Sequence, residues 1–311
     1  MQILYLGPPD MLEHVRSCFG KWATVNLAAE EHAADALLPA TDAILDAFMG
    51  VPFPAHRLAN AEKLKLVVTV STGSDHIDAA ALQKRNIPLL TLADQKETMR
   101  NITPAAEHSW LLLMACARQL KAATAGVLAG EWNRNKYPGI MLQGKTLGVI
   151  GCGRIGEWMS RYAAAFRMKC IGFDPYVRDW PPTIEKVDLS ELLRTSDFIS
   201  IHVPLNDATR RMVGQAEFRQ MKRGVVLVNT SRGEVLDEAA LEAALRDGTV
   251  GAAGVDVLGG EPDVAGHSLI QYARENDNLM ITPHIAGFSP DALRTLLSFS
   301  CQRVMKHLSA P

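Results

Sequence analysis

The stretch Leu147-Gly-Val-Ile-Gly-Cys-Gly-Arg-Ile-Gly156 decides the fold. It carries the pattern G-x-G-x-x-G, with an apolar run that predicts a strand before it and a helical pattern after it. In this context Gly151 allows a tight turn, Gly153 lets the backbone approach a pyrophosphate, and Gly156 lets the helix lie close to the strand. The free N–H groups at the start of that helix favour an anion. The stretch therefore predicts a dinucleotide-binding turn.

An acidic residue follows the next apolar strand, because Lys169-Cys-Ile-Gly-Phe173 ends at Asp174. A carboxylate there can accept hydrogen bonds from both hydroxyls of an adenosine ribose, and it repels the 2′-phosphate of NADP. We therefore expect NAD rather than NADP, although Arg178 could accommodate that phosphate. The alternative is an ordinary glycine turn without a nucleotide, and the succession of strand, turn, helix, strand and acid argues against it.

Apolar strands alternate with helical patterns along the whole chain. This alternation predicts an α/β protein whose parallel sheets are covered by helices on both faces. The helical pattern Thr103–Lys121 is apolar nearly all round, which suggests burial between domains or subunits. Four strands are expected before it, at Gln2–Leu6, Asp42–Ala47, Leu64–Thr69 and Ile87–Leu92. Six are expected after it, at 146–150, 169–173, 197–203, 225–229, 250–257 and 279–281. Later helices are expected at 155–166, 189–194, 238–247 and 290–307.

Composition narrows the class of protein. A chain of 311 residues suggests two domains, at about 150 residues each. A net charge of −2 gives no reason to expect nucleic acid or an anionic membrane surface as a partner. The five cysteines form no CxxC pair, and no histidines show the spacing HExxH, so we expect neither a disulfide framework nor a bound metal.

The first residues and the apolar runs bear on localisation. The start of the chain lacks a basic region and predicts a strand rather than a signal peptide. The longest apolar stretch, Trp110–Ala117, is far shorter than the ~20 residues that cross a bilayer. We therefore expect a protein of the cytoplasm, where thiols stay reduced.

Three further segments each place one ionisable residue just after a predicted strand: Arg232, Glu261 and His284. Ligands of open α/β sheets bind at the carboxyl ends of the strands. An arginine can bind a carboxylate with both arms, a histidine can exchange a proton with a carbonyl oxygen, and a nearby glutamate favours the imidazolium. Each residue alone has a plainer explanation: a solvated loop arginine, a turn charge or a core histidine. Together, after a dinucleotide motif, they suit hydride transfer to a 2-oxo acid.

Several stretches together resemble the D-isomer-specific 2-hydroxyacid dehydrogenase family, over nearly the whole chain. They occur in the order and spacing of that family. They are Ser71-Thr-Gly-Ser-Asp-His-Ile-Asp78, Pro104-Ala-Ala-Glu-His108, Gly148–Gly156, His202-Val-Pro-Leu205, Asn229-Thr-Ser-Arg-Gly233 and Thr282-Pro-His-Ile-Ala-Gly287.

The resemblance implies two Rossmann-like, doubly wound parallel-sheet domains. The substrate domain would be discontinuous, formed by residues 1–97 and a returning C-terminal helix at 288–311, with an NAD-binding domain at 98–287. It also implies a homodimer built around the helix at 104–121. The chain ends at Pro311 without a further domain, which disfavours the long, regulated phosphoglycerate dehydrogenases.

The resemblance also implies roles for individual residues. Arg232 would bind substrate, Glu261 would tune the histidine, and His284 would be the acid/base. Backbone N–H groups of Thr72, Gly73 and Ser74 would hold the substrate carboxylate, and Arg232 and His284 would also bind the substrate. The cofactor-binding set would be Gly151, Gly153, Arg154, Ile155, Gly156, Asp174, His202, Val203, Pro204, Thr230, Ser231, Asp256 and Gly287. Phe48 and Met49 suggest an apolar wall near the substrate, or part of the core.

We therefore expect an NAD-dependent oxidoreductase that acts on a small D-2-hydroxy acid or 2-oxo acid. The alternative is an NADH-sensing binding protein of the co-repressor type, which would keep the same residues. Which acid is the substrate, and in which direction the reaction runs, stay open.

Overall fold

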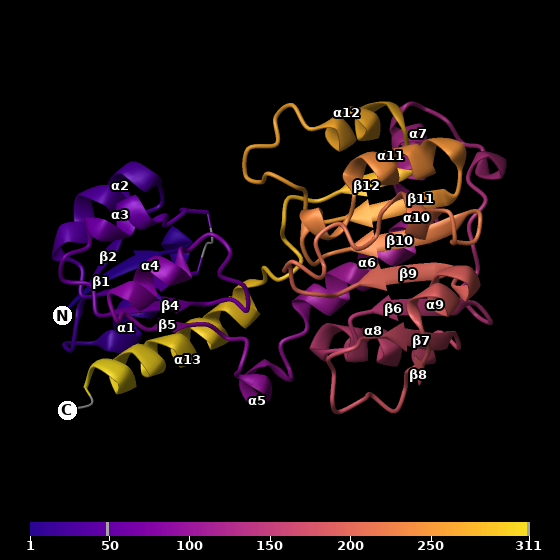
Figure 1. The fold of residues 1–311 in the computed structure, drawn as a ribbon. Coiled ribbons are helices and arrows are strands. Elements are labelled where there is room, and N and C mark those ends of the chain that lie inside the picture. The colour runs from indigo at the N-terminus through magenta and orange to yellow at the C-terminus, as the bar shows by residue number, and fades with distance from the viewer. Residues whose placement is uncertain (48–49, 310–311) are drawn as a thin grey trace. The chain divides into compact units, whose positions relative to one another are not determined.

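The computed structural model describes residues 1–47 and 50–309, and the chain divides into two units (Figure 1). Unit 1 comprises Met1–Ile102 and Ser289–Pro311, and unit 2 comprises Thr103–Phe288. The sequence placed these boundaries at 97/98 and 287/288. Unit 1 is therefore built from both ends of the chain.

Unit 1 is a five-stranded parallel sheet in the order β2-β1-β3-β4-β5. This is the order of flavodoxin-like doubly wound folds, with its switch point between β1 and β3. The strands are β1 (Gln2–Leu6), β2 (Thr24–Leu27), β3 (Ala43–Asp46), β4 (Leu66–Thr69) and β5 (Leu89–Leu90). The helices are α1 (Leu12–Phe19), α2 (Glu31–Leu37), α3 (Ala55–Ala59), α4 (Ala79–Lys84), α5 (Lys96–Met99) and α13 (Pro290–Leu308), with short 3₁₀ turns at Pro9–Met11 and Leu38–Ala40.

Side chains of β1 alternate between two cores, one on each face of the sheet. Ile3 and Tyr5 join the cluster formed with α1 and α13. Leu4 and Leu6 join the cluster on the other face. This alternation is what a strand covered on both faces requires. In Figure 1 the C-terminal helix α13 lies along the same face as α1, with which it packs.

Unit 2 is a seven-stranded parallel sheet in the order β12-β11-β10-β9-β6-β7-β8. Counted from β6, the order is that of the dinucleotide-binding fold with one more strand, and its switch point lies between β6 and β9. The strands are β6 (Thr146–Ile150), β7 (Lys169–Phe173), β8 (Glu185–Lys186), β9 (Phe198–Ile201), β10 (Val225–Asn229), β11 (Val250–Val255) and β12 (Leu279–Ile281). The helices are α6 (Pro104–Ala117), α7 (Leu120–Leu128), α8 (Arg154–Ala165), α9 (Leu189–Thr195), α10 (Gln215–Phe218), α11 (Glu238–Asp247) and α12 (Ser268–Glu275), with 3₁₀ turns at Arg134–Lys136 and Gly233–Val235.

Helix α6 packs against the sheet of unit 2. Leu112 and Leu113 are buried in the same cluster as Val149 and Val228 of the strands. A Cβ at Gly254 of β11 would lie 2.9 Å from the Cβ of Leu112, so the glycine allows the helix to approach the sheet. One face of α6 is therefore buried in the core of unit 2. Leu111 lies on a different face of the helix and is 55% exposed.

Several elements differ from the sequence-based expectation. The helix expected over Thr103–Lys121 is two helices, because Gln119 adopts φ +49° and separates α6 from α7. The strands β2 and β8 and the helices α2, α3, α5, α10 and α12 were not expected. Both strands lie at sheet edges, and the residues of β8 are exposed, so no apolar run marks it. Helix α12 has only eight residues and buries Leu269 and Tyr272, so it offers two core positions and too short a stretch for a helical period to stand out.

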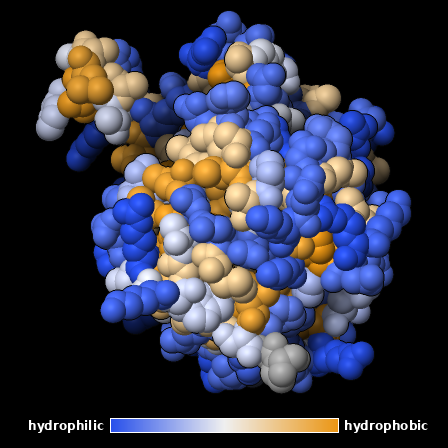
Figure 2. Space-filling model, turned by 90° about the vertical axis from the view of Figure 1, so that its left-hand side faces the viewer, coloured by the Kyte–Doolittle hydropathy of each residue, from blue (hydrophilic) through white to orange (hydrophobic). Residues whose placement is uncertain are grey.

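The face of the molecule in Figure 2 is mostly hydrophilic, with hydrophobic patches between the polar side chains. Within residues 1–47 and 50–309, no single helix has the length and apolarity to cross a bilayer, although one bent pair of helical segments passes by length and composition alone.

Candidate functional site

The glycine turn after β6 has the close contacts that the motif requires. Gly151 adopts φ +93°, and a Cβ there would lie 2.5 Å from the carbonyl oxygen of His202. A Cβ at Gly156 would lie 2.3 Å from the carbonyl oxygen of Gly151. By contrast, a Cβ at Gly153 would meet nothing within 4 Å, so the start of α8 is open beside it. The turn therefore offers bare backbone N–H groups to an anion.

The residues that follow β9 lie against this turn. His202 and Val203 are the neighbours that a side chain at Gly151 would strike. The two loops therefore meet at the switch point of the sheet, where dinucleotides bind in this fold. The His202 ring makes a 2.7 Å hydrogen bond with the Ser200 hydroxyl, and burial lowers the pKa of His202 to about 3. The imidazole is therefore neutral at physiological pH.

Asp174 follows β7 and is fixed by backbone donors. Its carboxylate accepts hydrogen bonds from the amides of Cys152 at 3.0 Å, Tyr176 at 2.8 Å and Val177 at 3.0 Å. The first of these joins the acidic residue directly to the glycine turn. The carboxylate thus stands beside the turn that would hold the pyrophosphate, as expected for a ribose ligand. Arg178 lies close by in the sequence and is exposed.

His284 and Glu261 form a pair at the carboxyl ends of β11 and β12. The Nδ1 atom of His284 lies 2.8 Å from Oε1 of Glu261, and both side chains are partly exposed. A carboxylate on Nδ1 leaves Nε2 available to exchange a proton with a substrate and stabilises the imidazolium. The structure therefore brings together two of the three residues expected to be catalytic.

Arg232 lies after β10, the strand beside β11. The turn that carries it is held by Asn229, which is fully buried and whose amide donates to the Arg232 carbonyl at 2.9 Å. The other end of this amide accepts from the Ser231 amide and hydroxyl. A Cβ at Gly233 would lie 2.1 Å from the Leu258 carbonyl carbon, so this turn packs closely on the loop that leads to Glu261.

Asp256 holds the turn that contains His284. Its side chain is fully buried, and it accepts hydrogen bonds from the amides of Ile285 at 2.9 Å and Ala286 at 2.7 Å and from the Thr282 hydroxyl at 2.5 Å. His284 itself has φ +52°, an uncommon conformation for a residue other than glycine. The hydrogen bonds to Asp256 stabilise this strained backbone.

Helix α6 contributes polar contacts to the same region. His108 places Nε2 2.9 Å from the Thr282 hydroxyl and 3.5 Å from the Asp256 carboxylate. Ser109 forms a 2.7 Å hydrogen bond with the Thr230 hydroxyl. Sequence reasoning assigned no role to Asn229, His108 or Thr282. The only indication in the sequence that these three residues belong to the site is that they lie within stretches that resemble the family.

The segment expected to hold the substrate carboxylate belongs to unit 1. Thr72, Gly73 and Ser74 follow β4, and Ser74 accepts a hydrogen bond of 2.9 Å from the Ile77 amide. The Ser71 hydroxyl donates to the Gly73 carbonyl at 2.6 Å. Phe48 and Met49 lie outside the residues that the structure describes.

A dinucleotide-binding sheet with a His–Glu pair and an arginine at its strand ends is the arrangement expected of a nicotinamide-dependent dehydrogenase. Comparison with known proteins gives the family. Residues 110–286 match the model for the NAD-binding domain of D-isomer specific 2-hydroxyacid dehydrogenases, and residues 21–96 match the model for their catalytic domain. The chain belongs to this family.

Named relatives support an enzyme. The chain is 37% identical to glycerate dehydrogenase of Methylorubrum extorquens over 79% of this chain and 76% of that one. It is 36% identical to hydroxypyruvate reductase of Thermotoga maritima over 79% of this chain and 78% of that one. It also matches D-3-phosphoglycerate dehydrogenases but spans only about half of their length, 47% for that of Methanocaldococcus jannaschii.

A similar solved structure supports NAD as the cofactor. The D-lactate dehydrogenase of Aquifex aeolicus, solved with NAD and lactic acid, matches with a TM-score of 0.87 and 26% identity, over 99% of this chain and 96% of that one. The protein is thus an NAD-dependent 2-hydroxyacid oxidoreductase. The alternative, an NADH-sensing binding protein, is not favoured by these matches.

Proposed function

We propose that the protein interconverts a small D-2-hydroxy acid and its 2-oxo acid, with His284 as acid/base, Glu261 as its partner and Arg232 as the substrate-binding cation. The observation that carries this proposal is the 2.8 Å contact between Nδ1 of His284 and Oε1 of Glu261 at the carboxyl ends of the strands. The residues around the glycine turn fit a dinucleotide, because Gly153 leaves the start of α8 open.

The bound nicotinamide supplies or accepts the hydride. As a 2-oxo acid is reduced, negative charge grows on its carbonyl oxygen, and the Nε2–H of protonated His284 donates a proton to that oxygen. Glu261 stabilises the imidazolium before this transfer. The planar guanidinium of Arg232 binds the substrate carboxylate with two parallel hydrogen bonds and so orients the carbonyl. In the reverse direction His284 accepts the hydroxyl proton. Acid–base catalysis of this kind contributes about 10²–10⁴-fold in rate.

The substrate proposed is a short 2-oxo acid such as hydroxypyruvate or glyoxylate. Two of the similar enzymes are named glycerate dehydrogenase and hydroxypyruvate reductase, which supports this choice. Backbone N–H groups of Thr72, Gly73 and Ser74 would bind the carboxylate, as the family resemblance implies. The remaining cofactor contacts follow the same resemblance: the pyrophosphate at Arg154 and Ile155, and the nicotinamide side near Thr230, Ser231, Asp256 and Gly287.

The direct test is oxidation of NADH by a panel of 2-oxo acids, followed by absorbance, with the wild-type enzyme and His284→Asn. We expect turnover that falls about 10²–10⁴-fold in the variant while NADH binding is kept. His307→Asn, which changes an exposed histidine of α13, is the matched control. Equal activity of wild-type and His284→Asn enzymes would refute the assignment of the acid/base.

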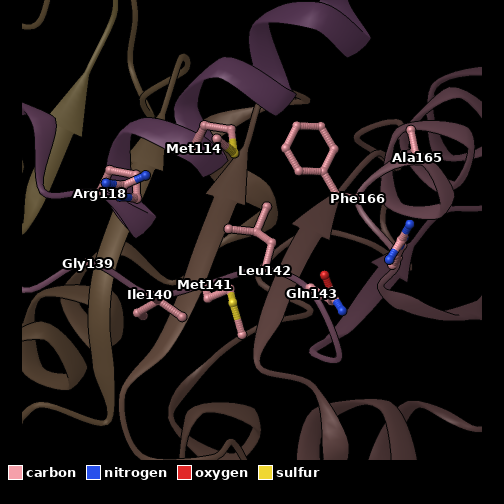
Figure 3. A pocket seen from close by; sticks show the side chains of 10 residues that line it. Met114, Arg118, Gly139, Ile140, Met141, Leu142, Gln143, Ala165 and Phe166 are labelled. Carbon is pink, nitrogen blue, oxygen red and sulfur yellow. The ribbon is translucent and has the colours of Figure 1, made fainter.

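A homodimer and a cytoplasmic location complete the proposal. Exposed apolar side chains gather on and after α6 and α7: Leu111, Leu120, Val127, Leu128, Trp132 and Met141. A hollow of about 530 Å³ adjoins them, and Figure 3 shows Met114, Leu142 and Phe166 around it. Apolar surface of this kind marks protein interfaces. Sedimentation of the wild-type protein and of Leu111→Glu tests the dimer, since the introduced charge should dissociate it.

The five free cysteines support a reducing compartment, which fractionation of the source cells would test.

A further inference from the structure

A cluster of reactive side chains lies where α1 packs against α13 in unit 1, apart from the residues of the proposed reaction. Cys18 on α1 places its sulfur 3.8 Å from Nε2 of His14 and 4.0 Å from the hydroxyl of Ser298 on α13. The His14 ring also lies 2.9 Å from that hydroxyl. The contacts join the first α-helix of the chain to the last one.

The His14 ring is oriented toward the sulfur by a second contact. Arg294 places Nη1 3.4 Å from Nδ1 of His14. Because an arginine only donates, Nδ1 is the acceptor and Nε2 carries the proton. The Nε2–H then faces the Ser298 hydroxyl at 2.9 Å and the Arg294 carbonyl oxygen at 3.2 Å, with the Cys18 sulfur 3.8 Å away. The thiolate is the nucleophilic form of cysteine, and the imidazole and the hydroxyl are the polar groups that face this sulfur.

A second thiol lies beside Cys18. Cys301 is one turn beyond Ser298 on α13, so the two residues share a face of the helix. Cys18 packs against the hydrophobic cluster that contains Cys301. Burial raises the pKa of the Cys301 thiol, and the neighbouring Cys18 thiol raises it further. The pair therefore combines a partly exposed thiol with a fully buried one.

The other three cysteines lack this environment. Cys116, Cys152 and Cys170 are buried, and burial raises the pKa of each thiol to about 12. Buried thiols of this kind do not meet a peroxide in solvent, and unlike Cys301 none of these three is placed beside Cys18. Of the five cysteines, Cys18 alone is both partly exposed and faced by a histidine.

We propose that Cys18 and Cys301 form a peroxide-sensitive modification site that closes into a disulfide between α1 and α13. The Cys18 thiolate, whose proton has gone to solvent, attacks one oxygen of a hydroperoxide. The O–O bond breaks, the sulfur is oxidised to sulfenic acid, and the released oxygen leaves as water or an alcohol after taking up a proton. The Cys301 thiol then attacks the Cys18 sulfur, the S–O bond breaks, and water leaves with the thiol proton. Two thiols are oxidised by two electrons, and one hydroperoxide is reduced.

The disulfide would link the two separate stretches of chain that build unit 1. Such a link removes conformational freedom from the unfolded chain, and more so when the closed loop is long. The loop here contains nearly the whole chain. The oxidised protein should therefore unfold at a higher temperature than the reduced protein, and the difference should vanish on reduction. This site is independent of the proposed catalytic residues.

The experiment treats the full-length protein with hydrogen peroxide after removal of reductant. We expect loss of two titratable thiols and a linked peptide pair containing Cys18 and Cys301, found by mass spectrometry without reduction. In Cys18→Ser both should be absent at the same dose. In Cys301→Ala and Cys301→Ser the reaction should stop at a Cys18 sulfenic acid, which a dimedone probe captures. His14→Asn should slow the loss of thiols several-fold.

Controls separate the site from a folding defect. Reduced Cys18→Ser should show the circular dichroism and melting temperature of the reduced wild-type protein, because Cys18 is only partly buried. The proposal is overturned if Cys18→Ser loses thiols as fast as the wild type. It is also overturned if the linked peptides join Cys18 to another cysteine or to a second chain, or if oxidation leaves the melting temperature unchanged.

Discussion

The backbone amide of His284 donates a 2.7 Å hydrogen bond to the carbonyl oxygen of Asp256, and the Asp256 carboxylate accepts from the next two amides of the same turn. The aspartate thus holds His284 at φ +52°. A buried carboxylate that accepts this many hydrogen bonds is a strong constraint on the backbone around it. Asp256 therefore positions the histidine, whatever it contributes to cofactor binding.

Asp256→Asn should destabilise the protein and slow the reaction. An amide nitrogen in place of one oxygen faces an N–H and leaves a buried donor unsatisfied, which costs about 1–3 kcal/mol. The free energy of unfolding should fall by that amount, and kcat should fall more than the KM for NADH changes. Asp207→Asn, at an exposed loop position, is the control. A variant that loses stability but keeps its kcat would show that the turn does not position His284.

Glu261→Gln should lower the kcat for reduction of a 2-oxo acid. The amide can still bond to Nδ1 of His284, but it does not stabilise the imidazolium that donates the proton. We expect a fall of about 10²-fold, at the lower end of the range for acid–base catalysis. Stability should change little, because Glu261 is only partly buried.

The matched control for Glu261→Gln is Glu242→Gln, which removes a surface carboxylate paired with Arg246 on α11. It should keep wild-type kinetics. Steady-state rates at saturating NADH measure both variants. If Glu261→Gln keeps more than half of the wild-type kcat, the carboxylate orients the ring without contributing its charge.

Much of the fold and the site could be predicted from local pattern. The glycine turn between Leu147 and Gly156 is recognisable because Gly151 and Gly156 allow close backbone contacts and Gly153 leaves the start of α8 open. The alternation of strands and helices gave both parallel sheets. The edge strand β8 could not be predicted, because two exposed residues leave no apolar signal. The break at Gln119 was also hidden, since no glycine or proline lies near it to mark the end of a helix.

The supporting residues of the site show the limit of sequence reasoning. His284 and Glu261 could be proposed from their chemistry and their places after strands. His108 could not be assigned, because its contact with Thr282 joins residues 174 positions apart and depends on how α6 crosses the sheet. Asn229 resembles an ordinary turn residue until its burial is known. Packing, rather than residue type, makes these side chains part of the site.

Asp174→Ser should weaken the binding of NADH and reduce the enzyme's preference for NADH over NADPH. A carboxylate that binds a ribose hydroxyl contributes about 1.5–3 kcal/mol, so the KM for NADH should rise about 10- to 100-fold. The KM for NADPH should rise less, because the repulsion of its phosphate is removed as well. The ratio of kcat/KM for the two cofactors measures this effect. Asp179→Asn, at an exposed position on the same loop, should leave the ratio unchanged. If the ratio of kcat/KM for NADH and NADPH is unchanged in Asp174→Ser, Asp174 does not bind the adenosine ribose.

His202 should make the protein lose stability in acid. The pKa of His202 is about 3 in the folded protein and 6.5 in the unfolded chain. Between pH 6.5 and pH 3 the unfolded chain therefore binds a proton at this ring that the folded protein does not. Above pH 6.5 the ring is neutral in both states and does not change the free energy of unfolding. That free energy falls as the pH decreases from 6.5 toward 3. Between about pH 7 and 5 this loss is about 2 kcal/mol.

Denaturant titrations of wild-type and His202→Asn proteins at both pH values test this prediction. The variant should show a fall in unfolding free energy about 2 kcal/mol smaller than the wild type, whatever its absolute stability. His32→Asn, which changes an exposed histidine, should keep the wild-type pH dependence. Parallel curves for wild type and His202→Asn would mean that the ring is protonated in the folded protein.

His76 should fix the proposed carboxylate-binding loop through Asp46. The Nε2 atom of His76 lies 2.5 Å from the carboxylate of Asp46, which is almost fully buried at the end of β3. The His76 carbonyl accepts a 2.7 Å hydrogen bond from the Phe53 amide, a contact that survives any side-chain change. His76→Ala should therefore leave the loop in place but loosen it next to Ser74. We expect the KM for the 2-oxo acid to rise several-fold while kcat and the KM for NADH stay near wild type.

His76→Gln provides the matched comparison, because its side-chain amide can still donate to Asp46. It should recover most of the affinity for the 2-oxo acid that His76→Ala loses. A general loss of stability would lower the activity of both variants together and would not separate the two KM values. If the KM values for NADH and the 2-oxo acid rise in parallel in His76→Ala, the His76–Asp46 pair serves the fold of unit 1 rather than the substrate loop.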